Sequence, residues 1–234
     1  MRISNGSQSI ENIVPISPAF DTPGLLARDI ATMQTVHKHW LKQSNTLNYT
    51  SFPKRIIMPE EWWPPKNGTS LPLYEDFISK LANYTGAIVE SKNLNDSFKS
   101  YTGHEEGIIP YQGRARTIYS HSDSGRLLVE PYYEDFMEKF GYMPFVNPTN
   151  RIRFSTGPNY TQEEIHDSWE RIEVVKDWWL SDVLPTCEST AIVVPFAPGI
   201  EEYRDVSKIP FHCMCFHTDF TPVGVPHGTQ TQCQ

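Results

Sequence analysis

The chain has 234 residues, of which 38% are hydrophobic, and a formal net charge of −8. This length suits one sizeable domain. Its mean hydropathy is −0.46, and no apolar run approaches the ~20 residues that span a bilayer, so we expect a soluble globular protein. The negative charge argues against nucleic acid as a partner, because such binding rewards basic patches.

Three helices are predicted from capping residues and apolar periodicity. Asp29 is a plausible N-cap for a helix that starts at Ile30. A second helix is expected over about 72–84, with Gly86 as its C-terminal stop. A third covers about 132–140. The apolar faces expected for the first two comprise Ile30, Met33, Val36 and Trp40, and Leu73, Phe77, Ile78 and Leu81.

A longer helix has the clearest start of all. In Thr161-Gln162-Glu163-Glu164, the Thr hydroxyl and the second Glu can cap each other's amides, which is a capping box. Apolar residues follow at three- and four-residue steps as far as Val183, and Pro185 ends the pattern.

Strands are expected between these helices, at about 51–58, 87–90 and 190–196. Their alternation with helices indicates the α/β class. A short helix is expected at 93–101. Residues 103–125 look polar and irregular, although 114–119 could be a strand or a helical turn, and 144–154 look like a turn followed by an extended basic segment.

The amino-terminal segment carries a family resemblance. Residues 2–6 (Arg-Ile-Ser-Asn-Gly) are similar to an R-P-S-H-G stretch, and residues 17–24 and 27–29 are similar to S-P-x-x-D-T-P-G-x-x-A-R-D. Both stretches occur, in this order, in amidases of the amidase-signature family. The Tyr133-x-x-Phe136-x-x-x-Phe140-Gly141 pattern and the Trp-rich helix after it resemble a fungal-type branch. The resemblance covers about residues 2–205, and residues 206–234 form a diverged or aberrant tail.

The resemblance implies a partial amidase-signature fold, with a mixed β-sheet flanked by helices and truncated at both ends, in which residues 1–234 form a single partial domain. The family's nucleophilic Ser, its cis-peptide Ser and its Lys lie upstream of the matching stretch and would precede Met1. No catalytic residue is therefore assigned to this chain. Asp21, Gly24 and Arg28 match a structural motif, in which we expect Arg28 to be a buried, ion-paired scaffold residue.

The expected function follows from this resemblance. The full-length parent would cleave a small-molecule carboxylic amide through a Ser acyl-enzyme, with no cofactor and no metal, and this chain alone would be inactive. The alternative is a non-catalytic binding or interaction protein derived from an amidase. We expect no membrane or nucleic-acid partner, and the oligomeric state stays open.

Asparagine placement suggests a secretory parent. Six of the eleven Asn residues begin an Asn-x-Ser/Thr sequon, which favours N-glycosylation in the secretory pathway over chance; a cytoplasmic location is the alternative. The six predicted glycosylation sites are Asn5, Asn48, Asn67, Asn83, Asn95 and Asn159.

Other polar clusters are assigned structural roles. Ser120, His121 and Asp123 are too close in sequence to converge as a triad, so a solvated loop is expected there. The His and Cys residues at 212–217 do not have a recognised zinc spacing, so chance or an aberrant reading frame is favoured there, and a metal-binding tail around Cys213 is the alternative. Residues 37–39 and His104 are expected at the surface.

The four Cys residues allow three disulfide pairings. Core and loop packing, rather than an acyl pocket, is expected for Trp62, Trp63, Trp178 and Trp179.

Overall fold

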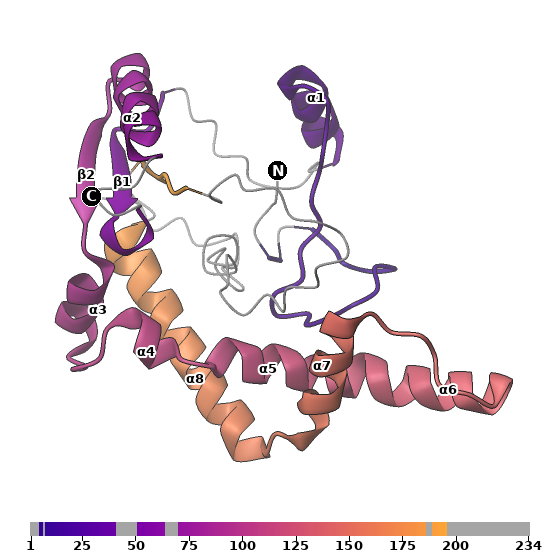
Figure 1. Ribbon diagram of the computed structural model, residues 1–234. Helices are drawn as coiled ribbons and strands as arrows, with labels where there is room; N and C mark the ends of the chain where they lie inside the picture. Colours follow the sequence, from indigo (N-terminus) through magenta and orange to yellow (C-terminus); the bar gives the residue numbers. More distant parts are fainter. Residues whose placement is uncertain (1–4, 7, 41–50, 64–69, 186–188, 196–234) are drawn as a thin grey trace.

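The computed structural model describes residues 5–6, 8–40, 51–63, 70–185 and 189–195. Helices predominate, and three strands form a parallel sheet at one end of the molecule (Figure 1). In chain order the elements are α1 (Ile30–Trp40), β1 (Arg55–Pro59), η1 (Glu60–Trp62), α2 (Leu71–Thr85), β2 (Ile88–Lys92), α3 (Leu94–Thr102), α4 (Ile108–Gln112), α5 (Ala115–Ser124), η2 (Gly125–Val129), α6 (Glu130–Phe140), α7 (Pro148–Thr156), η3 (Gly157–Asn159), α8 (Gln162–Trp178), η4 (Trp179–Val183) and β3 (Thr190–Ile192).

The sheet has the strand order β2-β1-β3, with β1 in the centre. Ile57 of β1 is opposite Glu90 of β2 and Ile192 of β3, and it is fully buried. Parallel neighbours need a crossover connection, and α2 supplies it between β1 and β2. The described strands are all parallel, which corrects the expectation of a mixed sheet for this part of the chain. The third strand is only half-buried.

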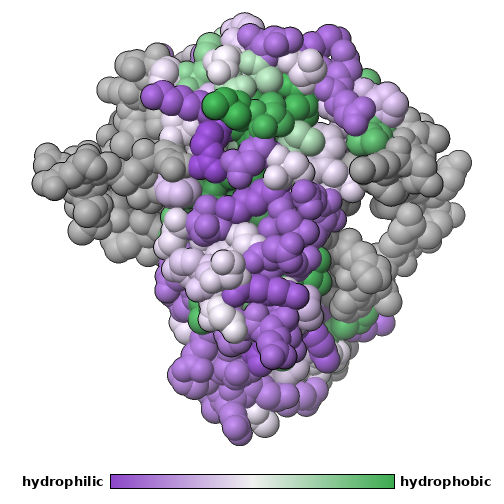
Figure 2. Space-filling model, turned by 90° about the vertical axis from the view of Figure 1, so that its left-hand side faces the viewer, coloured by the Kyte–Doolittle hydropathy of each residue, from purple (hydrophilic) through white to green (hydrophobic). Residues whose placement is uncertain are grey.

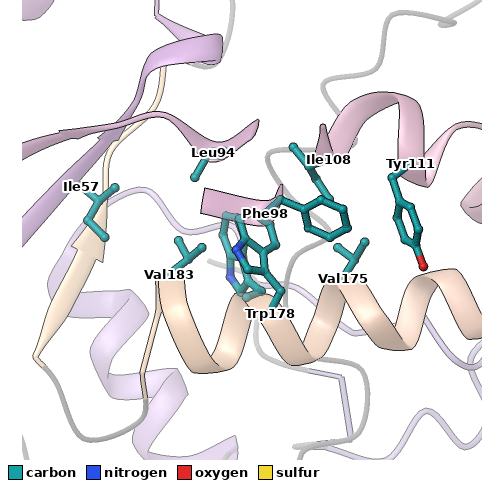
Figure 3. Packing of buried hydrophobic residues seen from close by; sticks show 9 residues of the cluster. Ile57, Leu94, Phe98, Ile108, Tyr111, Val175, Trp178 and Val183 are labelled. Atoms are coloured by element: carbon teal, nitrogen blue, oxygen red, sulfur yellow. The ribbon is translucent and has the colours of Figure 1, made fainter. Parts of the chain in front are cut away.

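The main core lies where α8 crosses α3, α4 and the sheet (Figure 3). Phe98 meets Trp178 edge to face at 5.3 Å between ring centroids and Tyr111 at 4.9 Å. The Trp178 indole donates a hydrogen bond to Ser97 Oγ at 3.0 Å, so its polar end is paired inside the core. The tryptophans were correctly predicted to pack: Trp178 and Trp179 are buried, and Trp62 packs against the same cluster.

The predicted helix ends are confirmed where capping residues marked them. Asp29 Oδ1 accepts a hydrogen bond from Thr32 N at 2.7 Å at the start of α1. The Thr161–Glu164 capping box is formed in full. Gly86 ends α2 in the left-handed conformation, with φ +71°, which favours glycine.

The predicted apolar faces were less accurate. None of the described residues of α1 is buried. On α2, Leu73 is 69% exposed and Phe77 is 54% exposed, while Ile78 is buried. In this part of the structure, the periodic apolar stripes of α1 and α2 are therefore largely open to solvent.

Two expectations of irregular structure were wrong. Residues 103–125 contain α4 and α5, and α5 continues through the π-helical η2 into α6 as one rod (Figure 1). Residues 148–156 form α7 rather than an extended segment. Both α5 and α7 are rich in Ser, Thr and Arg and contain few apolar residues, so their apolar periodicity is a weak signal. Packing against α8 and η3 decides the conformation of α5.

Candidate functional site

Residues 17–24, which carry part of the family motif, fold as a turn that Asp21 organises. We call this segment the motif turn. The Asp21 carboxylate accepts hydrogen bonds from the backbone amides of Ile16 and Ser17, at 2.8 and 3.0 Å. The amides of Phe20 and Asp21 in turn donate to the Ser17 carbonyl, both at 2.8 Å. A short carboxylate side chain is suited to this role because it can cap amides a few residues before it. Asp21 is therefore the residue that gives this turn its shape.

The turn is attached to α5 by a buried hydrogen bond. Ser17 Oγ donates to Asp123 Oδ2 at 2.8 Å, and Arg126 donates to the other oxygen of the same carboxylate at 3.0 Å. Ser17 is 2% exposed and Asp123 is 6% exposed. The hydroxyl of Ser124 lies 2.9 Å from the Ile16 carbonyl oxygen. Asp123 is thus a buried carboxylate with a partner at each oxygen, as burial of a charge requires.

His121, on the same helix, contacts α7 instead. Its Nδ1 lies 2.8 Å from the Thr156 hydroxyl. Burial, followed by the positive charges of Arg153 and Arg114, lowers the pKa of His121 to about 4. The imidazole is consequently neutral at pH 7. A Cβ added at Gly157 would lie 2.0 Å from the His121 carbonyl oxygen, so this contact leaves room only for glycine.

This geometry gives His121 and Asp123 different partners. Asp123 accepts from Ser17 and Arg126, whereas the His121 ring is hydrogen-bonded to Thr156. A hydrolytic triad needs the His to bridge the nucleophile and the carboxylate. The cluster instead joins the motif turn, α5 and α7. The expected solvated loop was wrong, since these residues are helical and Asp123 and Ser124 are buried.

A second polar network, which the sequence did not indicate, lies beside the core. The Glu61 carboxylate accepts from the amides of Leu94 and Asn95, at 3.1 and 2.7 Å, and so caps the first turn of α3. Asp182 pairs with Lys92 at 2.7 Å and accepts a hydrogen bond from Ser97. Burial alone raises the pKa of Asp182, but the hydrogen bonds from Lys92 and Ser97 and the charges of Lys92 and Arg55 outweigh it and lower that pKa.

The remaining sequence-predicted residues fall in several places. Gly24 lies beside an open, mainly apolar depression that is also lined by Val36 and Trp40 of α1. Arg28 is exposed, so the expectation that it is buried was wrong.

His104 is exposed and its ring lies 4.5 Å from that of Tyr111. The His and Cys residues at 212–217, Cys187, Cys233, Asn48 and Asn67 lie outside the described residues, as does the tail at 206–234.

Neither a metal site nor a membrane span is found in the part of the chain that the structure describes. Within it, no group of three or more His, Cys, Asp or Glu side chains is placed to hold a metal ion. The helices described there are too short or too polar to cross a bilayer.

Comparison with known proteins identifies the fold. No family model matches the sequence. Among solved structures, the chain is similar to one described as a crystal structure of amidase, with a TM-score of 0.60 and 18% sequence identity. The match covers 84% of this chain and 40% of the amidase chain. The fold is therefore amidase-like, which confirms the resemblance at the level of the fold. The chain spans well under half the length of the protein that it matches.

Proposed function

We propose that this chain is the carboxyl-terminal part of an amidase-signature hydrolase of the fungal type. The parent would cleave the carboxylic amide bond of a small molecule through an acyl-enzyme on Ser. The observation that carries the proposal is the amidase-like fold over 84% of the chain. The motif turn at residues 17–24, attached to α5 by the Ser17–Asp123 hydrogen bond, adds to it.

In this proposal the chain supplies scaffold, and the Ser, cis-peptide Ser and Lys come from residues outside it. The exposed surface of the sheet supports this. Parallel sheets occur almost always with both faces covered, yet Ile88 of β2 is 72% exposed and Val89 is 38% exposed. The apolar area at the height of α2 and β2 in Figure 2 is the surface that further parts of an amidase would cover.

The test is an activity measurement on the chain alone and on the chain co-expressed with the amino-terminal part of an amidase-signature enzyme. The readouts are ammonia release from a panel of aliphatic and aromatic amides and labelling by a fluorophosphonate, which reacts with activated Ser. The proposal predicts neither ammonia release nor labelling for the chain alone, and both for the combined parts.

Labelling of the isolated chain would contradict the proposed inactivity. The variants Ser17→Ala and Ser124→Ala then distinguish the two buried hydroxyls near Asp123 from any other Ser. If neither variant removes the label, the nucleophile lies elsewhere in the chain.

A second candidate is a non-catalytic binding protein derived from an amidase. The observation in its favour is a buried core shared by β1, α3, α4, α8 and η4 that the chain forms from its own residues. A monodisperse 26.9 kDa chain with a cooperative thermal transition supports this candidate. A chain that is soluble only with the amino-terminal part of an amidase argues against it.

A further inference from the structure

Four of the six sequons begin at residues that the structure describes, and their surroundings differ. The sequence motif is the same at each, so it cannot rank them. N-glycosylation attaches a bulky, hydrated oligosaccharide to the side-chain nitrogen Nδ2 of Asn. A folded protein can carry that group only where Nδ2 faces solvent and has a hydrogen that is not in a hydrogen bond with the protein.

Asn5 uses both hydrogens of this nitrogen. Nδ2 donates to the Pro18 carbonyl at 3.0 Å and to the Asp21 carbonyl at 2.7 Å. An amide NH₂ has two donor hydrogens, and a glycosylated Asn keeps one. A glycan on Asn5 would therefore remove one of the two hydrogen bonds that Asn5 makes to the motif turn.

Asn95 is held by packing. It is half-buried in the first turn of α3, and its Oδ1 is shielded from solvent. A Cβ built on Gly107 would lie 2.2 Å from Oδ1 and 3.0 Å from the Cβ of Asn95, so the Asn95 side chain lies flat against the Gly107 backbone. A substituent on this amide would disturb the contact between Asn95 and Gly107, which joins α3 to the start of α4.

Asn83 and Asn159 are both exposed. Asn83 is in the last turn of α2, two residues before Thr85 ends the helix. Asn159 ends η3, in the connection between α7 and α8, and its Nδ2 donates one hydrogen bond, to the Ser155 carbonyl at 2.7 Å. That bond uses one hydrogen and leaves the other for substitution.

We propose that Asn83 and Asn159 carry N-linked oligosaccharides and that Asn5 and Asn95 do not in the folded protein. The donor is an oligosaccharide linked to a lipid diphosphate. Nδ2 bonds to the anomeric carbon of the sugar, the bond from that carbon to the phosphate oxygen breaks, and the lipid diphosphate leaves while one amide proton is released. This inference is independent of the proposed amidase function.

The structure also indicates when transfer occurs. The hydroxyl of Thr85 donates to the Leu81 carbonyl at 2.8 Å, and the Thr161 hydroxyl accepts from the Glu164 amide at 3.2 Å. Both sequon hydroxyls are thus engaged in helices after folding. We therefore expect transfer before these helices form, and a chain modified at Asn5 or Asn95 would lose the contacts described above.

The experiment is site-resolved occupancy. The full chain is expressed behind a cleavable secretion signal in a eukaryotic host, and the folded monomer is isolated. It is deglycosylated enzymatically in ¹⁸O water, which converts each glycosylated Asn to labelled Asp for peptide mass spectrometry. We expect the label at Asn83 and Asn159, and Asn83→Gln and Asn159→Gln each remove one glycan.

Asn95→Gln and Asn5→Gln are matched controls that leave the number of glycans on the folded monomer unchanged. Unlabelled Asn83 or Asn159 overturns the proposal, and so does label at Asn5 or Asn95 in the folded monomer. If the host retains the chain, the same mapping is done on chain translated into microsomes, where absence of label at Asn83 or Asn159 again overturns it.

Discussion

At the scale of single residues, the polar contacts that hold this molecule together join positions far apart in the sequence. Ser17 and Asp123 are 106 residues apart, and Ser97 and Trp178 are 81 residues apart. Sequence analysis identified Asp21 as part of a motif and the tryptophans as packing residues, because those assignments depend on local pattern. It missed the partners of Asp123, His121 and Glu61, since which buried groups meet is decided by the fold.

His121 gives a prediction for the pH dependence of stability. Its pKa is about 4 in the folded chain, against an ordinary value of 6.5. Between these values the unfolded chain binds more protons, so the free energy of unfolding falls as the pH is lowered through this window. The stabilisation is fully present above about pH 6.5 and is lost progressively as the pH falls toward 4.

His121→Asn tests this, because Asn keeps a polar atom near the position of Nδ1 and does not titrate. We expect the variant to be less stable than the wild type at pH 7, with a difference that narrows as the pH falls toward 4. Urea unfolding across the pH range measures it. Parallel pH profiles for the two proteins would show that His121 is not the titrating group.

At the scale of elements, α2 and α8, which combine an apolar periodicity with a marked end, were predicted well, whereas α5 and α7, which contain few apolar residues, were missed. The capping box of α8 and the Gly stop of α2 are local features. A local feature of α7 was also present: Asn147 accepts a hydrogen bond from the Asn150 amide at 2.8 Å, and Pro148 follows at the first helical position. Asn followed by Pro is a sequence signal for the start of a helix, and this sequence contains it. In α5, by contrast, the conformation depends on packing against α8 and η3.

The capping box of α8 is expected to contribute measurably to stability. Thr161→Ala removes the hydroxyl that accepts from the Glu164 amide, and should cost about 1 kcal/mol. Thr161→Ser keeps an oxygen at the same position and should cost little. Chemical denaturation followed by circular dichroism measures both. Equal stability of the Ala and Ser variants would mean that the cap is not formed.

The contact between η3 and α5 gives a steric prediction. Gly157→Ala places a Cβ 2.0 Å from the His121 carbonyl, a backbone atom that cannot move aside alone, so we expect a loss of about 3 kcal/mol. The control is Gly86→Ala, where a Cβ meets nothing within 4 Å but φ is +71°. There, left-handed strain alone should cost about 1 kcal/mol. A smaller loss for Gly157→Ala than for Gly86→Ala in thermal unfolding would contradict the packing of η3 on α5.

At the scale of the whole molecule, the described sheet is small, and apolar side chains of its edge strand β2 are exposed to solvent. We expect the isolated chain to self-associate through this surface, because exposed apolar strands pair and aggregate. Ile88→Lys, at a side chain that is 72% exposed, should reduce association in light scattering without lowering the midpoint of unfolding. Ile57→Lys, at a fully buried position in the next strand, is the contrasting variant and should unfold the chain. If Ile88→Lys leaves the association unchanged, the chain associates through a different surface.

The α/β class and the amidase resemblance were predictable from the sequence because they depend on alternating elements and a short motif. The exposure of the sheet was not, since the same apolar strand residues occur whether or not other parts of a protein cover them. The central claim is that this chain is the scaffold part of an amide hydrolase. The most direct measurement is the sequence of the full-length transcript upstream of Met1. The account predicts an in-frame extension that encodes the Lys and a Gly/Ser-rich loop with the nucleophile. A message whose reading frame begins at Met1 would contradict it and favour the non-catalytic binding protein.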